Sequence, residues 1–194
     1  KALCVVLGHV GKDSINRKVL SSLFNAGLKK KDQKQQVSSH YDLGNEFYKL
    51  WLDETMSYSC AYFKHENDSL KDAQYQKVHH ILDKLYLKEG MTLLDIGCGW
   101  GFLLIEATRK YGVKGYGCTL SEEQWKKGQE RIKEYGLEGQ VEIELIDYRD
   151  VAASGRTFDR IVSIGMLEHV GRPNFPLYME DASDMLKDLS LIHI

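Results

Sequence analysis

The sequence predicts an α/β fold, a doubly wound and mostly parallel sheet, preceded by a helical and irregular N-terminal extension. From residue 69 onward, short apolar runs alternate with longer amphipathic stretches. A turn that contains Gly97, Gly99 and Gly101 follows the first of these apolar runs. The composition, with 43% hydrophobic and 28% charged residues, is that of a globular domain. Strands that alternate with helices form parallel sheets covered by helices.

The first helix of the α/β part is predicted over residues 69–88. Its apolar residues recur at helical spacing, and Ser69 with Asp72 has the spacing of a capping box. The pair Glu89-Gly90 ends this helix. We therefore divide the chain into an extension, residues 1–68, and a core, residues 69–194.

Four buried strands are predicted, over residues 91–96, 113–118, 141–146 and 158–164. Helices are predicted between them, over 102–111, where Gly112 follows, and from Ser121 to Gly136, with Ser121 and Gln124 in capping-box spacing. A last helix is predicted over residues 174–187, after Pro173.

The net charge of −2 is unevenly distributed. Residues 1–40 hold eight Lys and Arg against two Asp, a net +6, so the remaining residues carry a net −8. A basic arm suits an anionic surface, either lipid headgroups or nucleic acid. A solvated helix face explains the same charges, and the sequence does not separate these interpretations.

The four cysteines, Cys4, Cys60, Cys98 and Cys118, are far apart and form no C-x-x-C pair. This pattern indicates neither a zinc site nor a disulfide scaffold, so we expect no metal and a reducing, cytoplasmic setting. The apolar run near the start, residues 2–7, is too short for a membrane span and lacks the flanks of a signal peptide.

The glycine turn is the sharpest local motif. It runs from Leu93 through Asp95, Gly97, Cys98, Gly99 and Trp100 to Gly101. In a doubly wound sheet such a turn lies where the ligand binds. The turn has no basic residue for a phosphate, whereas Asp95 suits an amino group or a sulfonium-bearing ligand. The D-x-G-x-G-x-G pattern resembles the S-adenosylmethionine-binding turn of the Rossmann-like class I methyltransferases.

Two further segments follow predicted strands. In this class of enzymes, an acid at the position of Asp147 accepts a hydrogen bond from the adenine amino group. The segment after the second strand lies near the expected ribose but lacks the usual acid. Its polar contacts must then come from the hydroxyls of Thr119 and Ser121 and from the amide of Gln124.

Several segments together resemble the cyclopropane-fatty-acyl-phospholipid synthases, which include the mycolic acid cyclopropane synthases. They are 40–45 (HYDLGN), 56–63 (MSYSCAYF), the glycine turn, 119–124 (TLSEEQ), 147–150 (DYRD) and 158–171 (FDRIVSIGMLEHVG). The resemblance covers about residues 36–187 of the chain.

The resemblance implies a reaction. The methyl of S-adenosylmethionine is transferred to a cis double bond of a phospholipid acyl chain, and bound bicarbonate removes a proton so that a cyclopropane ring closes. The intermediate cation needs a pocket without water. The implied partners are unsaturated phospholipid and, through the basic arm, the inner face of the membrane, without nucleic acid. Whether the protein forms a homodimer is left open by the sequence.

The resemblance also assigns residues. Cys60 and Glu168 match the pair that holds bicarbonate, and we expect Glu168 to be a buried acid with a raised pKa. The residues that match the cofactor segments are Tyr58, Ser59, Leu93, Asp95, Gly97, Cys98, Gly99, Trp100, Gly101, Thr119, Leu120, Ser121, Gln124, Asp147 and Tyr148.

The sequence is compatible with other functions. The same scaffold could methylate a lipid or small molecule without ring closure, and a lipid-binding module with a vestigial site is a weaker alternative. The resemblance further implies a truncated, poorly active chain. Residues 189–194 (LSLIHI) are interpreted either as a translated library-adapter end, which we prefer, or as a fifth strand that carries His193 slightly before a family bicarbonate histidine.

Overall fold

The computed structural model describes residues 44–194. In this part, one sheet has the strand order β3-β2-β1-β4-β5 and parallel pairing throughout. The strands are β1 (Thr92–Ile96), β2 (Lys114–Thr119), β3 (Val141–Leu145), β4 (Phe158–Val162) and β5 (Leu186–His193). The predicted doubly wound parallel sheet is confirmed. Because the order reverses beside β1, a ligand crevice is expected at the carboxyl ends of β1 and β4.

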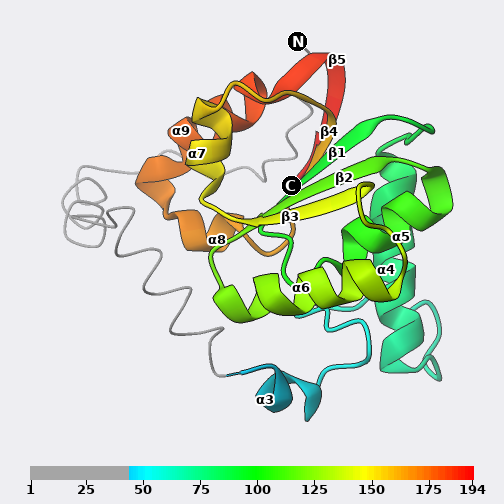
Figure 1. Cartoon of the computed structure of the whole chain (residues 1–194). Coiled ribbons are helices and arrows are strands. Elements are labelled where there is room, and N and C mark those ends of the chain that lie inside the picture. The colour runs from blue at the N-terminus through cyan, green and yellow to red at the C-terminus, as the bar shows by residue number, and fades with distance from the viewer. Residues whose placement is uncertain (1–43) are drawn as a thin grey trace, which may run out of the picture.

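Helices cover both faces of the sheet (Figure 1). The bounds are α3 (Asn45–Lys49), α4 (Leu70–Lys84), α5 (Phe102–Tyr111), α6 (Glu122–Glu134), α7 (Tyr148–Ala153), α8 (Leu167–Val170), the 3-10 turn η1 (Arg172–Asn174) and α9 (Phe175–Asp184). Helices α4, α5 and α6 lie on one side of the sheet, and α7 and α9 lie on the other. The short helices α7 and α8 were not predicted, because their few residues carry little periodicity.

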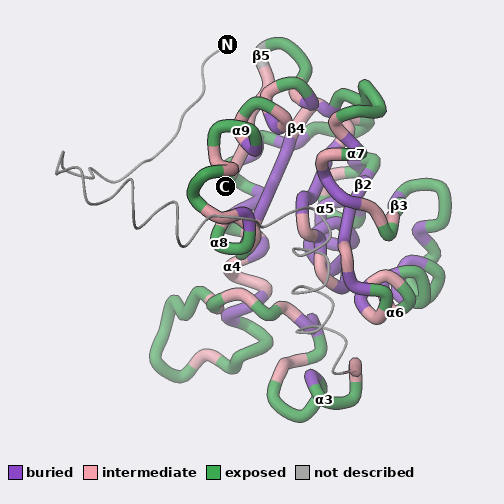
Figure 2. The backbone as a smooth tube through the Cα atoms, turned by 90° about the vertical axis from the view of Figure 1, so that its left-hand side faces the viewer, coloured by how far each residue is buried: buried purple, intermediate pink, exposed green. Residues whose placement is uncertain are grey.

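The core consists of two hydrophobic clusters, one under each layer of helices. Neighbouring residues of β1 serve opposite clusters, since Leu93 packs in the first and Leu94 in the second, both fully buried. This is the alternation expected of a strand buried on both faces. Figure 2 shows burial concentrated in β2 and β4, while the segments around α3 are largely exposed.

Both predicted helix caps are confirmed. The side chain of Ser69 accepts a hydrogen bond from the backbone N–H of Asp72, and the side chain of Ser121 accepts one from the N–H of Gln124. The helix predicted from Ser69 ends earlier, at Lys84. The last predicted helix also ends early, because residues from 186 onward form the edge strand β5.

Strand β5 contains most of residues 189–194, the segment that was interpreted from the sequence as a translated library adapter. Ile192 pairs with Ile161 and His193 with Val162 of β4, and the N–H of Ser163 donates to the carbonyl of His193 over 2.9 Å. The structure thus agrees with the strand interpretation. The adapter interpretation concerns the origin of these residues and stays a prediction.

The basic arm, residues 1–40, lies outside the described residues. The described part of the extension packs on the core through Tyr48 and Met56, which are buried against Trp100 of the glycine turn. The division of the chain at residue 68 stays a prediction. Among residues 44–194, every helix is too short or too polar to cross a membrane.

Candidate active site

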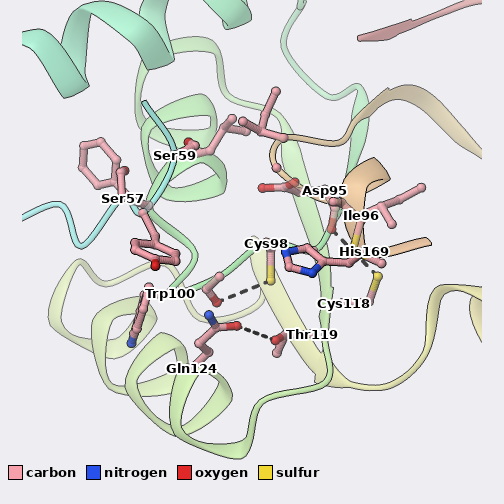
Figure 3. Close-up of a pocket in the computed structure, with 18 of the residues that line it drawn as sticks. Ser57, Ser59, Asp95, Ile96, Cys98, Trp100, Cys118, Thr119, Gln124 and His169 are labelled. Atoms are coloured by element: carbon pink, nitrogen blue, oxygen red, sulfur yellow. Dashed lines mark hydrogen bonds between the residues drawn. The ribbon is translucent and has the colours of Figure 1, made fainter. Parts of the chain in front are cut away.

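A cavity of about 760 Å³ opens at the carboxyl ends of the strands. The loops after β1, β2, β3 and β4 line it, together with α4 and residues 55–60 of the extension (Figure 3). Most of the predicted site residues border this cavity: Tyr58, Ser59, Cys60, Asp95, Gly97, Cys98, Gly99, Trp100, Thr119, Leu120, Gln124, Asp147, Tyr148 and Glu168. The fold therefore brings five segments that are separate in the sequence to one site.

Three predicted cofactor residues, Leu93, Gly101 and Ser121, are not among the residues that line the cavity. Leu93 is buried in the core cluster, and Ser121 is a fully buried helix cap. Gly101 is the N-cap of α5 at φ 80°, where a Cβ atom would lie 2.5 Å from Cδ1 of Ile143. Leu93 and Ser121 have structural roles, since their side chains face the interior, and Gly101 shapes the turn before α5, where no Cβ atom fits.

Asp95, at the end of β1, is the buried acid of the site. Among residues 44–194, no cation forms a hydrogen bond or ion pair with its carboxylate. Burial raises the pKa of Asp95 to about 7, an effect that Lys77 partly opposes. The position faces the cavity just before the glycine turn (Figure 3). A ligand that brings an ammonium or sulfonium group would supply the missing positive charge. The residues present therefore fit the amino group of S-adenosylmethionine.

The loop after β2 presents an oriented amide. The hydroxyl of Thr119 donates to Oε1 of Gln124 over 2.7 Å and accepts from the N–H of Ser121 over 3.2 Å. With Oε1 engaged in this way, the NH₂ group of Gln124 is the donor presented at the cavity. The hydroxyls of Thr119 and Ser121 thus hold the loop, and a cofactor contact through Gln124 stays a prediction.

Asp147 follows β3 and caps α7. Its carboxylate accepts from the N–H of Arg149 and forms an ion pair with the guanidinium of Arg149, at 2.6 Å between Nη2 and Oδ2. Asp147 is buried, and Tyr148 beside it is buried against Tyr178, with 5.0 Å between ring centroids. The carboxylate at the predicted adenine position is therefore held in one orientation by Arg149.

The resemblance matches Cys60 and Glu168 to the pair that holds bicarbonate. These two residues are far apart in the sequence, and both line the cavity. Cys60 is an exposed free thiol. Glu168 lies in α8 and is exposed, so the expectation of a buried acid is wrong. The reason is that α8 is a short helix at the mouth of the cavity, beyond the buried end of β4.

The family model of mycolic acid cyclopropane synthetase matches residues 28–193. The chain belongs to this family. Relatives include the cyclopropane-fatty-acyl-phospholipid synthase of Escherichia coli (strain K12), 45% identical over 93% of this chain and 45% of that protein. A probable fatty acid methyltransferase of Pseudomonas putida is 45% identical over 84% of this chain and 41% of that protein.

Among solved structures, the mycolic acid cyclopropane synthase CmaA1 complexed with SAH and CTAB is 36% identical, with a TM-score of 0.78. The match covers 82% of this chain and 55% of that one. The fold of this cyclopropane synthetase family member is thus the Rossmann-like fold of class I methyltransferases. The chain spans about half the length of the relatives it matches.

Lys77 and His193 are among the cavity residues that were not assigned from the sequence. Lys77 of α4 lines the cavity, although it falls between the buried residues Ala73 and Ile81. A lysine at the i+4 position within an apolar stripe is the signal that could have identified it. His193, left open by the sequence, also lines the cavity, and burial lowers its pKa. No cluster of three or more candidate metal ligands occurs among residues 44–194.

Proposed function

We propose that the protein carrying this chain transfers the methyl group of S-adenosylmethionine to a cis double bond of a lipid acyl chain and closes a cyclopropane ring. The observation that carries this proposal is that Cys60 and Glu168 border the same cavity as Asp95 and the glycine turn. The cavity thus combines a site that suits a cationic cofactor, at Asp95, with a pair of polar side chains, Cys60 and Glu168. The family membership supports the same reaction.

The cofactor would be held by groups already oriented in the structure. When bound, S-adenosylmethionine supplies a methyl group activated by its sulfonium. Asp95 would bind the amino group, Gln124 a ribose hydroxyl, and Asp147 the adenine amino group. The glycine turn lets the backbone approach without Cβ atoms in the way. Alignment of the methyl group with a weakly nucleophilic alkene would then provide much of the rate.

Bicarbonate is the proposed base, held between Cys60 and Glu168 at the cavity mouth. The thiol of Cys60 can donate a hydrogen bond, and Glu168 can share a proton with the bound bicarbonate. His193 lies in the same wall and offers a further polar contact. These side chains would keep the base beside the new methyl group, so that a proton leaves in place of attack by water.

The proposed substrate is an unsaturated phospholipid at the inner face of the membrane. Large hydrophobic side chains of the extension are exposed, among them Trp51, Tyr62 and Phe63. Together with the positive charge of residues 1–40, they suit an anionic lipid surface. The proposed location is therefore cytoplasmic and peripheral to the membrane, and dimerisation is left to direct measurement.

The experiment uses the full-length protein that contains this chain. It is incubated with labelled S-adenosylmethionine and vesicles of cis-unsaturated phospholipid, and the acyl chains are analysed by mass spectrometry. A gain of one CH₂ with loss of the double bond is expected. Absence of label from the lipid would contradict the proposal.

Glu168→Gln tests the assigned base site. We expect it to slow turnover much more than it weakens cofactor binding, while Glu180→Gln, an exposed glutamate on α9, leaves both unchanged. Equal losses in turnover and cofactor binding for Glu168→Gln would contradict the role.

A second candidate function is methyl transfer without ring closure. It is favoured by the similarity to the protein named as a probable fatty acid methyltransferase. Retention of the double bond in the methylated lipid would identify this reaction in the same mass spectrum.

A further inference from the structure

Helix α4 holds the segment that borders the cavity through two side chains. The amide Nε2 of Gln74 donates to the carbonyls of Ser57 and Ser59, each over 3.1 Å. One turn further along the helix, Nζ of Lys77 donates to Oγ of Ser59 over 2.8 Å. Ser59 and Lys77 both line the cavity, and Figure 3 shows Ser59 on the wall formed by the extension.

The contact between Lys77 and Ser59 has a direction. An ammonium group has donors and no acceptor, so Oγ of Ser59 must accept the hydrogen bond and cannot return its own proton. No other residue in the described part of the chain forms a hydrogen bond with this hydroxyl. The proton of Ser59 is thus available to an acceptor inside the cavity.

The charges that line the cavity indicate what that acceptor is. Asp95 forms an anionic position that suits an ammonium group. Of the Lys and Arg side chains that line the cavity within residues 44–194, Arg149 is paired with Asp147, which leaves Lys77 as the cation of the opposite wall. An amino-acid group with separate ammonium and carboxylate ends matches this arrangement.

We propose that Lys77 is a positioning residue that directs the Ser59 hydroxyl as a hydrogen-bond donor to the carboxylate of the bound cofactor. This inference rests on the proposed binding of S-adenosylmethionine. Lys77 acts through Ser59, and it has no bond-making role in methyl transfer.

Burial lowers the pKa of Lys77 to about 8, and the nearby groups Asp53, Cys60 and Asp95 oppose this shift. These groups belong to the extension and to β1, the two parts that face Lys77. Above about pH 8 the uncharged amine can accept a proton, so the Ser59 hydroxyl can turn toward Lys77. Affinity for a carboxylate should then decrease with rising pH.

The test is a double-mutant cycle on the whole chain, with Lys77→Met, Ser59→Ala and their combination. Dissociation constants are measured by calorimetry for S-adenosylhomocysteine and for 5′-methylthioadenosine, which lacks the amino-acid group. We expect Lys77→Met to weaken S-adenosylhomocysteine about tenfold, the worth of one hydrogen bond to a charged group. The affinity for 5′-methylthioadenosine should not change. In the Ser59→Ala background, Lys77→Met should cause little further loss of affinity for S-adenosylhomocysteine.

Two controls separate positioning from folding. Lys71→Met removes an exposed lysine of the same helix, paired with Glu54, and should leave both constants unchanged. Lys77→Arg keeps a cationic donor and should retain most of the affinity. In the wild-type chain alone, affinity for S-adenosylhomocysteine should decrease above about pH 8, and Lys77→Met should remove that decrease.

Equal losses for both ligands, or additive effects of the two substitutions, would overturn the positioning role. Should the Lys77→Met chain fail to fold, an unchanged affinity of the wild type across about pH 8 would overturn it as well. If wild-type chain binds neither ligand, the proposed cofactor itself is overturned.

Discussion

The indole nitrogen of Trp100 donates a hydrogen bond to Oδ1 of Asn45 over 2.6 Å. Trp100 belongs to the glycine turn, whereas Asn45 begins α3 in the extension. The amide nitrogen of Asn45 in turn donates to the carbonyl of Glu123 in α6 over 3.3 Å. One asparagine therefore joins the extension, the turn and the helix after β2, which are three parts of the cavity wall.

Asn45→Ala should loosen this junction. The buried Trp100 would lose its hydrogen bond to Asn45, which costs about 1 kcal/mol of unfolding free energy. Thermal denaturation should show a decrease of several degrees in Tm, and affinity for S-adenosylhomocysteine should decrease. Asn67→Ala, at an exposed asparagine of the extension, is the control and should change neither value. An unchanged Tm for Asn45→Ala would show that the junction does not stabilise the fold.

Asp95→Asn should stabilise the empty protein and abolish cofactor binding. The folded state raises the pKa of Asp95 from 3.8 to about 7, so the folded state binds this proton more tightly than the unfolded chain. The stability that this proton provides is present below about pH 4 and is lost as pH rises toward 7. Asparagine is neutral at every pH, so the variant should gain roughly 2–4 kcal/mol at pH 8.

Urea unfolding at low and high pH measures this gain. The difference between Asp95→Asn and the wild type should disappear near about pH 4. A variant that is less stable than the wild type at pH 8 would contradict the burial of an unpaired charge at this position.

Binding of S-adenosylhomocysteine should release a proton near neutral pH. Asp95 must be ionised to pair with the ligand's ammonium, and its pKa of about 7 leaves it largely protonated in slightly acidic solution. Affinity should therefore decrease as pH falls below about 7. Calorimetry in buffers of different ionisation enthalpy counts the released protons. With 5′-methylthioadenosine, which has no amino group, proton release should be absent.

Two glycines approach the same methyl group of Ile143. A Cβ atom at Gly101 would lie 2.5 Å from Cδ1 of Ile143, and one at Gly128 in α6 would lie 2.8 Å from it. Each Gly→Ala substitution should destabilise the protein by about 1–3 kcal/mol through overpacking. Ile143→Val removes this methyl group and costs about 1 kcal/mol alone.

In the Ile143→Val background, the two glycine substitutions should have different effects on stability. Gly128→Ala should become neutral or stabilising, because alanine favours a helix. Gly101→Ala should stay destabilising, since φ at this position is 80°. Unfolding free energies of the three single and two double variants measure the difference, and equal rescue of both glycine substitutions would rule out backbone strain at Gly101.

Much of the fold could be predicted because its signals are local. Ser69 and Ser121 cap helices through residues three positions away, and the apolar runs become buried parallel strands. The helix predicted over residues 174–187 was too long, since pairing with β4 decides that Leu186 begins a strand. Local secondary-structure propensity carries no information about that long-range pairing.

For the site, the sequence alone determined the glycine turn, Asp95 before it, and the segments around Cys60 and Glu168, because motif residues at fixed spacing carry that information. Only the tertiary structure decided that Glu168 is exposed, that Leu93 and Ser121 point away from the cavity, and that Lys77 reaches Ser59. Burial and hydrogen-bond direction depend on which helix packs beside which loop. Those relations exist only once residues far apart in the chain have been brought together.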